Sequence, residues 1–238
     1  MTPVRRIGVF GGTFDPIHRG HIDIGCAAER ALHLTRMLVI PASVPPHRAQ
    51  PLASSYHRFA MVALSVAGRP GWRASDLELW AGGPSYTSAT LEELHGRGYA
   101  SSELFFVIGA DAFTEIGAWK DYPGILDRAH FAVVSRPGCA SSQLPARLPD
   151  LARRMVRPPI DQLSRPDPSI ILVDAPTADV SSTVVRERCA LRQSIAGMVE
   201  PAVEQHIEQH GLYTSMVPGR RGNDKQPNPA AGGLNGQG

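Results

Sequence analysis

Short apolar runs alternate along the chain with longer segments whose apolar residues recur at helical spacing. A run of about four to eight apolar residues between turn signals is typical of a buried strand. We predict strands at such runs, and at one segment of alternating polarity, over residues 7–10, 36–42, 72–79, 103–109, 130–135 and 169–173. The pattern therefore predicts that a buried sheet forms the centre of the protein.

Helix signals occupy the segments between these runs. Apolar spacing, capping residues and closing glycines predict helices over residues 22–28, 55–66, 87–97, 112–116, 148–155, 182–192 and 201–210. Thr87 and either Ser181 or Ser182 are the predicted N-caps of two of them. From Thr214 onward Gly, Pro, Asn and charged residues prevail, so we expect a folded domain over 1–213 and a disordered tail over 214–238.

The amino-acid composition argues against several classes of protein. With 24 Lys and Arg against 22 Asp and Glu, the net charge of +2 is too balanced to indicate a nucleic-acid-binding surface. No apolar run approaches the roughly 18 residues of a membrane span, and we expect no signal peptide. Cys26, Cys139 and Cys189 are scattered and form no C-x-x-C pair, which is typical of a reducing compartment, so a cytoplasmic location is expected.

The candidate chemistry begins at the end of the first predicted strand. Residues 7–22 read I-G-V-F-G-G-T-F-D-P-I-H-R-G-H-I. Gly11 and Gly12 would let the backbone approach a ligand closely, and His18 and His21 follow at the predicted start of a helix. A helix start offers backbone N–H groups and a positive dipole end, and both suit a phosphate group. No Lys follows the glycines, so the segment is not the common phosphate-binding loop.

Two other interpretations of the histidines stay open from these residues. They could be solvated side chains in an ordinary strand-to-helix turn. They could also begin a zinc site, although no third ligand stands at a suggestive spacing.

The string G-G-T-F-D-P-I-H-R-G-H resembles the H-x-G-H nucleotidyltransferases, and specifically the bacterial nicotinate-mononucleotide adenylyltransferases. Further resembling strings follow in the family's order: P-P-H-R at 45–48, S-Y-T-S-A-T-L at 85–91, G-A-D-A-F-T-E-I-G-A-W-K at 109–120, R-P-G at 136–138 and V-S-S-T-V-V-R at 180–186. The resemblance covers residues 6–213. We therefore expect an α/β fold: a single doubly wound, Rossmann-like domain with a parallel sheet and C-terminal helices.

The resemblance implies that ATP reacts with nicotinate mononucleotide to give nicotinate adenine dinucleotide and pyrophosphate. Mg²⁺ is expected to enter with ATP, with no metal ligand on the protein. His18, His21 and Arg186 are the implied catalytic residues. The implied ATP-binding residues are Gly11, Gly12, Thr13, Phe14, His18, His21, Gly109, Asp111, Ser182 and Arg186.

The same resemblance places the second substrate elsewhere in the pocket. Its implied binding residues are His47, Arg48, Tyr86, Thr87, Ser88, Trp119, Lys120 and Arg136. Trp119 is expected to stack on the pyridine ring, while backbone amides near Thr87 and at Lys120 take its carboxylate. The chain departs from the family at Trp80 and Ala89, where a charged residue and Asp are usual.

Two alternative functions remain. A sibling transferase could act on another phosphorylated acceptor, such as phosphopantetheine, because the phosphate-handling strings would be shared. A catalytically silent dinucleotide-binding module is the second, and the intact His18, His21 and Arg186 argue against it. The expected partners are thus ATP and nicotinate mononucleotide, with neither nucleic acid nor membrane, and the sequence leaves monomer and homo-oligomer open.

Overall fold

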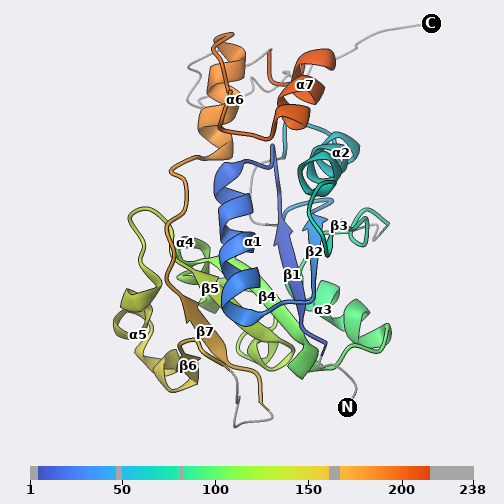
Figure 1. Ribbon diagram of the computed structural model, residues 1–238. Coiled ribbons are helices and arrows are strands. Elements are labelled where there is room, and N and C mark those ends of the chain that lie inside the picture. Colours follow the sequence, from blue (N-terminus) through green and yellow to red (C-terminus); the bar gives the residue numbers. More distant parts are fainter. Residues whose placement is uncertain (1–4, 47–49, 81–82, 161–166, 215–238) are drawn as a thin grey trace, which may run out of the picture.

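The computed structural model describes residues 5–46, 50–80, 83–160 and 167–214. Within them a seven-stranded sheet has the order β3-β2-β1-β4-β5-β7-β6, and every strand pair is parallel (Figure 1). The strands are β1 Ile7–Gly12, β2 Arg36–Pro41, β3 Trp72–Ala74, β4 Leu104–Gly109, β5 His130–Val134, β6 Met155–Val156 and β7 Ile170–Val173. The predicted parallel α/β fold is confirmed.

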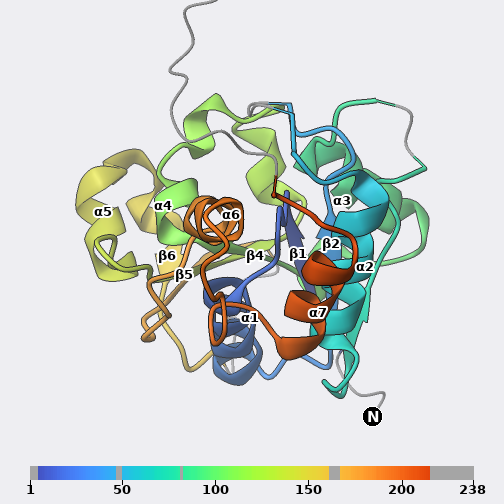
Figure 2. The same cartoon turned by 90° about the horizontal axis from the view of Figure 1, so that it is seen from above.

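Helices cover both faces of this sheet. They are α1 Arg19–Leu32, α2 Ser55–Val66, α3 Thr87–Gly96, α4 Ala110–Phe113, α5 Leu144–Arg147, α6 Ser182–Ala190 and α7 Pro201–Gln209. Figure 2, which views the molecule from above, shows α6 and α7 near the end of β1, with α7 beside α2. No helix in the described segments is long and apolar enough to cross a membrane.

Successive side chains of the strands point to opposite faces of the sheet and pack into two separate hydrophobic layers. In β5, Phe131 and Val133 belong to a buried cluster completed by α3, α4 and α5. Ala132 and Val134 belong to the other cluster, completed by α1, α2, α6 and α7. A parallel strand covered on both faces reads as a continuous apolar run, and for that reason the central strands were visible in the sequence. Burying each large apolar side chain stabilises the fold by about 1.5–3 kcal/mol.

Several predicted boundaries are wrong. The third strand stops at Ala74 instead of residue 79, because residues 77–80 form a turn. Residues 148–155 form a 3₁₀ helix, Pro149–Arg154, followed by the short edge strand β6. Helix α5 was not predicted. The N-cap of α3 is Tyr86, so Thr87 is its first helical residue. Asp111 lies inside α4, whose N-cap is Gly109.

Candidate active site

The predicted site residues that the structure describes lie on the loops and helices around the ends of β1 and β4. These two strands are neighbours in the sheet, and β1 has β2 on its other side, so the chain order reverses direction between them. In open parallel sheets, ligands bind outside the carboxyl ends of strands at such a reversal. Gly12 ends β1 and Gly109 ends β4. The topology therefore singles out this edge of the sheet before any side chain is considered.

The glycines at the end of β1 are enclosed by aromatic rings. A Cβ atom on Gly12 would lie 2.9 Å from the ring of Phe14, and one on Gly11 would lie 3.6 Å from that of Phe106. Phe14 is buried with a φ of 50°, a left-handed conformation that a bulky residue adopts rarely. Its ring meets that of His21 edge-on, with 5.0 Å between centroids. Phe14 thus fixes both the glycine turn and one histidine.

His18 and His21 stack on each other at the start of α1. Their ring centroids are 3.7 Å apart, and the backbone N–H of His18 donates to His21 Nδ1 at 3.2 Å. His18 is the N-cap and is 4% exposed. Burial, with a smaller contribution from the positive charge of Arg136, lowers the pKa of His18 from 6.5 to about 3. The imidazole of His18 is therefore neutral at physiological pH.

Arg136, which follows β5, crosses this edge of the sheet toward α1. Its Nη2 donates to the carbonyl oxygen of Val180 at 3.2 Å, and its Nε lies 4.0 Å from a carboxylate oxygen of Asp111. A Cβ on Gly20 would stand 2.6 Å from Arg136 Nη1 and 3.3 Å from His18 Cε1. Gly20 thus leaves the room in which the guanidinium reaches the start of α1.

Helix α6 brings its polar N-terminal end to the loop that follows β1. Ser181 is the N-cap, its hydroxyl accepting from the N–H of Val184. Ser182 Oγ donates to the carbonyl oxygen of Pro16 at 2.8 Å, and Arg186 Nη1 donates to that of Asp15 at 2.7 Å. Two elements more than 160 residues apart in sequence therefore meet immediately before His18.

Asp15 is the buried anchor of this loop, and no pattern in the sequence indicated a role for it. It is 5% exposed, and its carboxylate accepts from the N–H groups of Leu52 and Ala53 at 2.8 and 3.1 Å. The hydroxyl of Tyr213 donates to the same carboxylate at 2.8 Å, and burial together with the charge of Asp15 raises the pKa of that tyrosine. The carboxylate therefore ties the last described turn of the chain to the first loop.

Arg58, on α2, is a second anchor that the sequence analysis missed. Its side chain is 1% exposed, and burial lowers its pKa while the charge of Asp15 opposes that shift. The guanidinium donates to carbonyl oxygens of Thr13, Ala42, Ser43 and Ala53. It thereby joins the loops that follow β1 and β2.

The residues predicted for the second substrate lie on the β4 side. Trp119 packs edge-on against Phe106 with 5.9 Å between ring centroids, and Phe106 also faces Gly11. The Lys120 ammonium lies 4.6 Å from the ring centroid of Tyr86. Tyr86, Thr87 and Ser88 form the start of α3. These residues therefore share one side of the region around the glycine turn.

His47 and Arg48 lie outside the described residues. The segment just before them is placed against the start of α3, because Val44 and Pro84 form a parallel bridge. The N–H of Ser43 also donates to Ser85 Oγ at 2.8 Å. Of the two departures from the family, Trp80 is an exposed ring that donates to Asp76. Ala89 is simply an exposed residue in the first turn of α3.

Three buried side-chain nitrogens have no hydrogen-bond partner in the part of the chain that the structure describes. They are Nδ1 of His18, Nη1 of Arg136 and Nε of Arg186. A buried polar atom without a partner costs about 1–3 kcal/mol, more for a charged group. All three belong to the group of side chains around the loop after β1, so the unmet hydrogen-bonding capacity is concentrated there.

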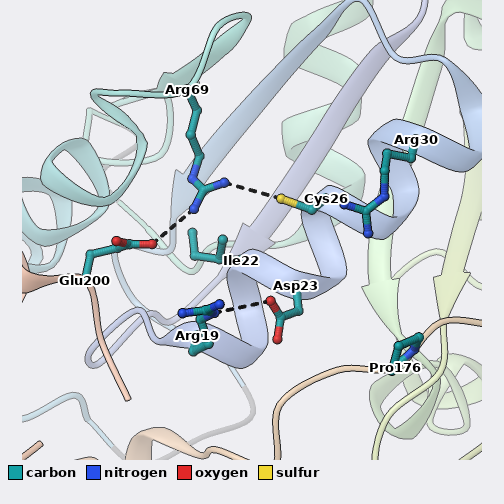
Figure 3. A pocket seen from close by; sticks show the side chains of 8 residues that line it. All are labelled: Arg19, Ile22, Asp23, Cys26, Arg30, Arg69, Pro176 and Glu200. Carbon is teal, nitrogen blue, oxygen red and sulfur yellow. Dashed lines mark hydrogen bonds and ion pairs between the residues drawn. The ribbon is translucent and has the colours of Figure 1, made fainter. Parts of the chain in front are cut away.

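A hollow of about 300 Å³ on the outer side of α1 is a different feature (Figure 3). Four of its five charged side chains already form ion pairs: Arg69 is 3.0 Å from Glu200, and Arg19 is 3.6 Å from Asp23. None of the predicted site residues lines it.

Comparison with known proteins places this geometry in context. The cytidylyltransferase-like family model matches residues 9–188. A curated relative from Desulfatibacillum aliphaticivorans, named probable nicotinate-nucleotide adenylyltransferase, is 36% identical over 221 residues, with 87% of this chain and 99% of that protein covered. One of the same name from Roseiflexus sp. (strain RS-1) is 40% identical over 208 residues, with 87% and 97% covered.

Solved structures of low sequence identity share the fold. The Plasmodium falciparum nicotinic acid mononucleotide adenylyltransferase complexed with APC aligns with a TM-score of 0.64 at 18% identity, covering 88% of this chain and 97% of that one. The same protein complexed with NaAD aligns with a TM-score of 0.65 at 17% identity and the same coverage.

Proposed function

Since this chain belongs to the cytidylyltransferase-like family and, within it, to the nicotinate-nucleotide adenylyltransferases, we propose that it transfers the adenylyl group of ATP to nicotinate mononucleotide. The products are nicotinate adenine dinucleotide and pyrophosphate. The observation that carries the proposal is the set of unpartnered nitrogens on His18, Arg136 and Arg186. Guanidinium donors match the geometry of phosphate oxygens, and a neutral imidazole can donate one further hydrogen bond to such an oxygen.

The reaction needs positioning more than acid–base chemistry. The phosphate of nicotinate mononucleotide is already an anion, so it can attack the α-phosphorus of ATP without a general base. A new P–O bond forms in line as the bond to the β-phosphate oxygen breaks, and the electron pair leaves with pyrophosphate. The protein's contribution is to align the two nucleotides and to stabilise the charge that develops between them.

Each phosphate-facing group has a distinct part in this proposal. Neutral His18 donates a hydrogen bond to the α-phosphoryl oxygens, and His21, which stacks on it, supports the same contact. Arg186 and Ser182 hold the leaving pyrophosphate from the start of α6. We reassign Arg136 from the pyridine nucleotide to the reacting phosphates, because its Nη1 lies toward His18 and Gly20.

The remaining residues bind the two nucleosides. The glycine turn with Thr13 and Phe14 supports the ATP side, and Gly109 with Asp111 takes the ribose hydroxyls. Trp119 stacks on the pyridine ring, as its position over Phe106 allows. The N–H groups at the start of α3 and at Lys120 take the carboxylate, and His47 and Arg48 take the mononucleotide phosphate.

A magnesium ion fits this site if it arrives on ATP. Both oxygens of Asp15 already accept hydrogen bonds from the protein, so that carboxylate is engaged. The Asp111 side chain is 59% exposed and can face the water shell of an ion. Mg²⁺ keeps several waters and binds mainly through substrate phosphates in such sites. When bound, it would neutralise charge on the triphosphate.

A panel of acceptors tests the proposal. Pyrophosphate release from ATP is measured with nicotinate mononucleotide, its amide and phosphopantetheine at equal concentrations. We expect nicotinate mononucleotide to be strongly preferred, because the amide lacks the charge that the N–H groups at α3 take. Equal rates with acid and amide would refute the carboxylate site, and a preference for phosphopantetheine would refute the assignment itself.

A further inference from the structure

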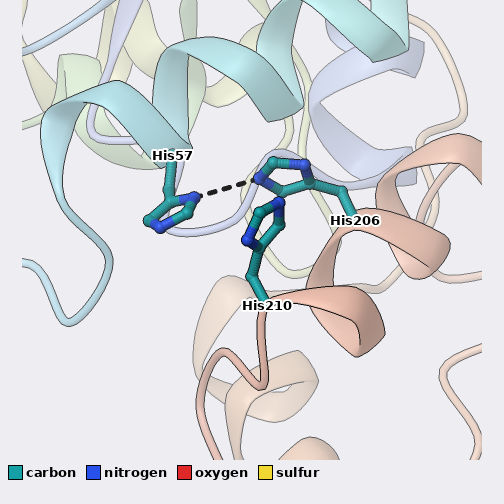
Figure 4. Close-up of side chains that lie close together, drawn as sticks. All are labelled: His57, His206 and His210. Carbon is teal, nitrogen blue, oxygen red and sulfur yellow. Dashed lines mark hydrogen bonds between the residues drawn. The ribbon is translucent and has the colours of Figure 1, made fainter.

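Three histidines that the proposed reaction does not use converge where α2 meets α7. His57 lies in the first turn of α2, and His206 and His210 stand four residues apart at the end of α7 (Figure 4). His57 Nδ1 and His206 Nε2 are 3.1 Å apart. One ligand nitrogen from each ring can be chosen so that all three lie within 4.8 Å of one another. The ring of His210 stands 4.4 Å from that of His206 and 4.8 Å from that of His57, between centroids.

This arrangement is close to that of a tri-histidine metal site. A tetrahedral zinc ion bound at about 2.0–2.1 Å requires its nitrogen ligands to be roughly 3.3 Å apart. The His57–His206 pair already meets that spacing, and His210 is exposed, so rotation of its side chain can bring it in. From this geometry we propose that His57, His206 and His210 form a binding site for a divalent transition-metal ion, with water in the fourth position.

The ligand set decides which metals fit. Imidazole nitrogens suit Zn²⁺, Cu²⁺, Ni²⁺ and Co²⁺, whereas Mg²⁺ and Ca²⁺ require oxygen ligands. The site is therefore distinct from the magnesium expected on ATP. The dipoles of the two helices offset each other, because His57 stands at the positive end of α2 and His210 at the negative end of α7. The affinity for the metal ion therefore comes from the three imidazole ligands and not from the helix dipoles.

A metal ion bound by these histidines would cross-link α2 and α7. Beyond His210 the chain turns at Gly211 and reaches Tyr213, whose hydroxyl holds Asp15. The metal would therefore stabilise the contact between residues 211–213 and the loop after β1 without touching either substrate.

Zinc binding to the full, untagged chain tests the proposal. The protein is stripped with a chelator and titrated with zinc chloride at pH 7.5 in a calorimeter. We expect one equivalent to bind, and His206→Ala or the exposed His210→Ala to weaken binding by about 100-fold or more, since even changes behind the ligands cost 10–100-fold. His33→Asn is the matched control, because it removes an exposed histidine at the end of α1 and should leave binding unchanged.

Two further measurements keep the proposal falsifiable. A hundredfold excess of zinc over its Kd should raise the Tm of the wild type by about 5–10 °C and that of His210→Ala by no more than about 1–2 °C. Cobalt(II) should give visible d–d bands without the thiolate charge-transfer band that Cys26 or Cys189 would produce. Absence of zinc binding to the wild type, binding by the His206→Ala and His210→Ala variants as tight as that of the wild type, or a thiolate band would overturn the site.

Discussion

The substitution Gly20→Ala, which adds one methyl group, should reduce activity while leaving the stability of the fold almost unchanged. The new Cβ would stand 2.6 Å from Arg136 Nη1 and 3.0 Å from the carbonyl oxygen of Ala178. The guanidinium is the free end of a flexible side chain and can move away, whereas the carbonyl needs to shift by only a few tenths of an ångström. We therefore expect Gly20→Ala to displace Arg136 while the helix stays intact.

The two consequences differ in size. Alanine in a helix is favoured over glycine by about 0.5–1 kcal/mol, which offsets the small strain, so the free energy of unfolding should change by less than about 1 kcal/mol. A hydrogen bond to a charged group contributes about 1.5–3 kcal/mol. If Arg136 makes one such bond to the reacting phosphates, its displacement lowers kcat/KM by roughly 10- to 150-fold, at about 1.36 kcal/mol per factor of ten.

The assay pairs pyrophosphate release with urea unfolding of the same preparation. Gly96→Ala is the matched control, because Gly96 ends α3 and an added Cβ there meets nothing within 4 Å. The control should keep full activity.

A double-mutant cycle then tests whether Gly20→Ala lowers activity by displacing Arg136. If Gly20→Ala acts through Arg136, combining it with Arg136→Met should cost no more than Arg136→Met alone. Full activity of Gly20→Ala, or additive losses in the double variant, would refute the role given to Arg136.

Three further changes test other contacts. Tyr213→Phe removes the hydrogen bond to buried Asp15 and should lower the free energy of unfolding in urea by about 1.5–3 kcal/mol; an unchanged midpoint would contradict the anchor. His130 Nδ1 accepts from the N–H of Ser169, and burial lowers the pKa of His130 to about 4, so stability is complete above pH 6.5 and falls as the pH drops from 6.5 to 4. Between pH 6.5 and 4 the free energy of unfolding of the wild type should fall by about 3 kcal/mol more than that of His130→Asn. If the free energies of unfolding of both proteins changed with pH in parallel, this role of His130 would be ruled out. Trp119→Leu should raise the KM for nicotinate mononucleotide by roughly 2- to 10-fold and leave that for ATP unchanged; equal shifts would argue against pyridine stacking.

The central sheet was predictable because its strands are buried on both faces. A run such as residues 104–109, with all six residues buried, has no periodicity to obscure it. The failures lie at the edges of the sheet, where β3 has three residues and β6 has two. Short edge strands bury little, so the chain carries little apolar signal there.

The sequence carries less information about the candidate site than about the fold. Local strings indicated His18, Ser182 and Trp119, and the structure brings them to one edge of the sheet. Asp15 and Arg58 were missed because their partners are backbone groups and a distant tyrosine, which no local pattern encodes. A signal existed for Arg58: it lies on the same buried stripe of α2 as Met61 and Val62. A cation on such a stripe needs several acceptors.

The hydrogen bond from Tyr213 to Asp15 spans 198 positions of the chain. A nascent polypeptide emerging from the ribosome completes the last strand of the described sheet at Val173 and still lacks α6, α7 and this tyrosine. The sheet can thus assemble during synthesis, whereas the first loop receives its final tether only when the closing turn has been translated. A chain terminated before Tyr213 would retain the strands of the sheet, but its loop after β1 would lack the hydrogen bond from Tyr213 to Asp15.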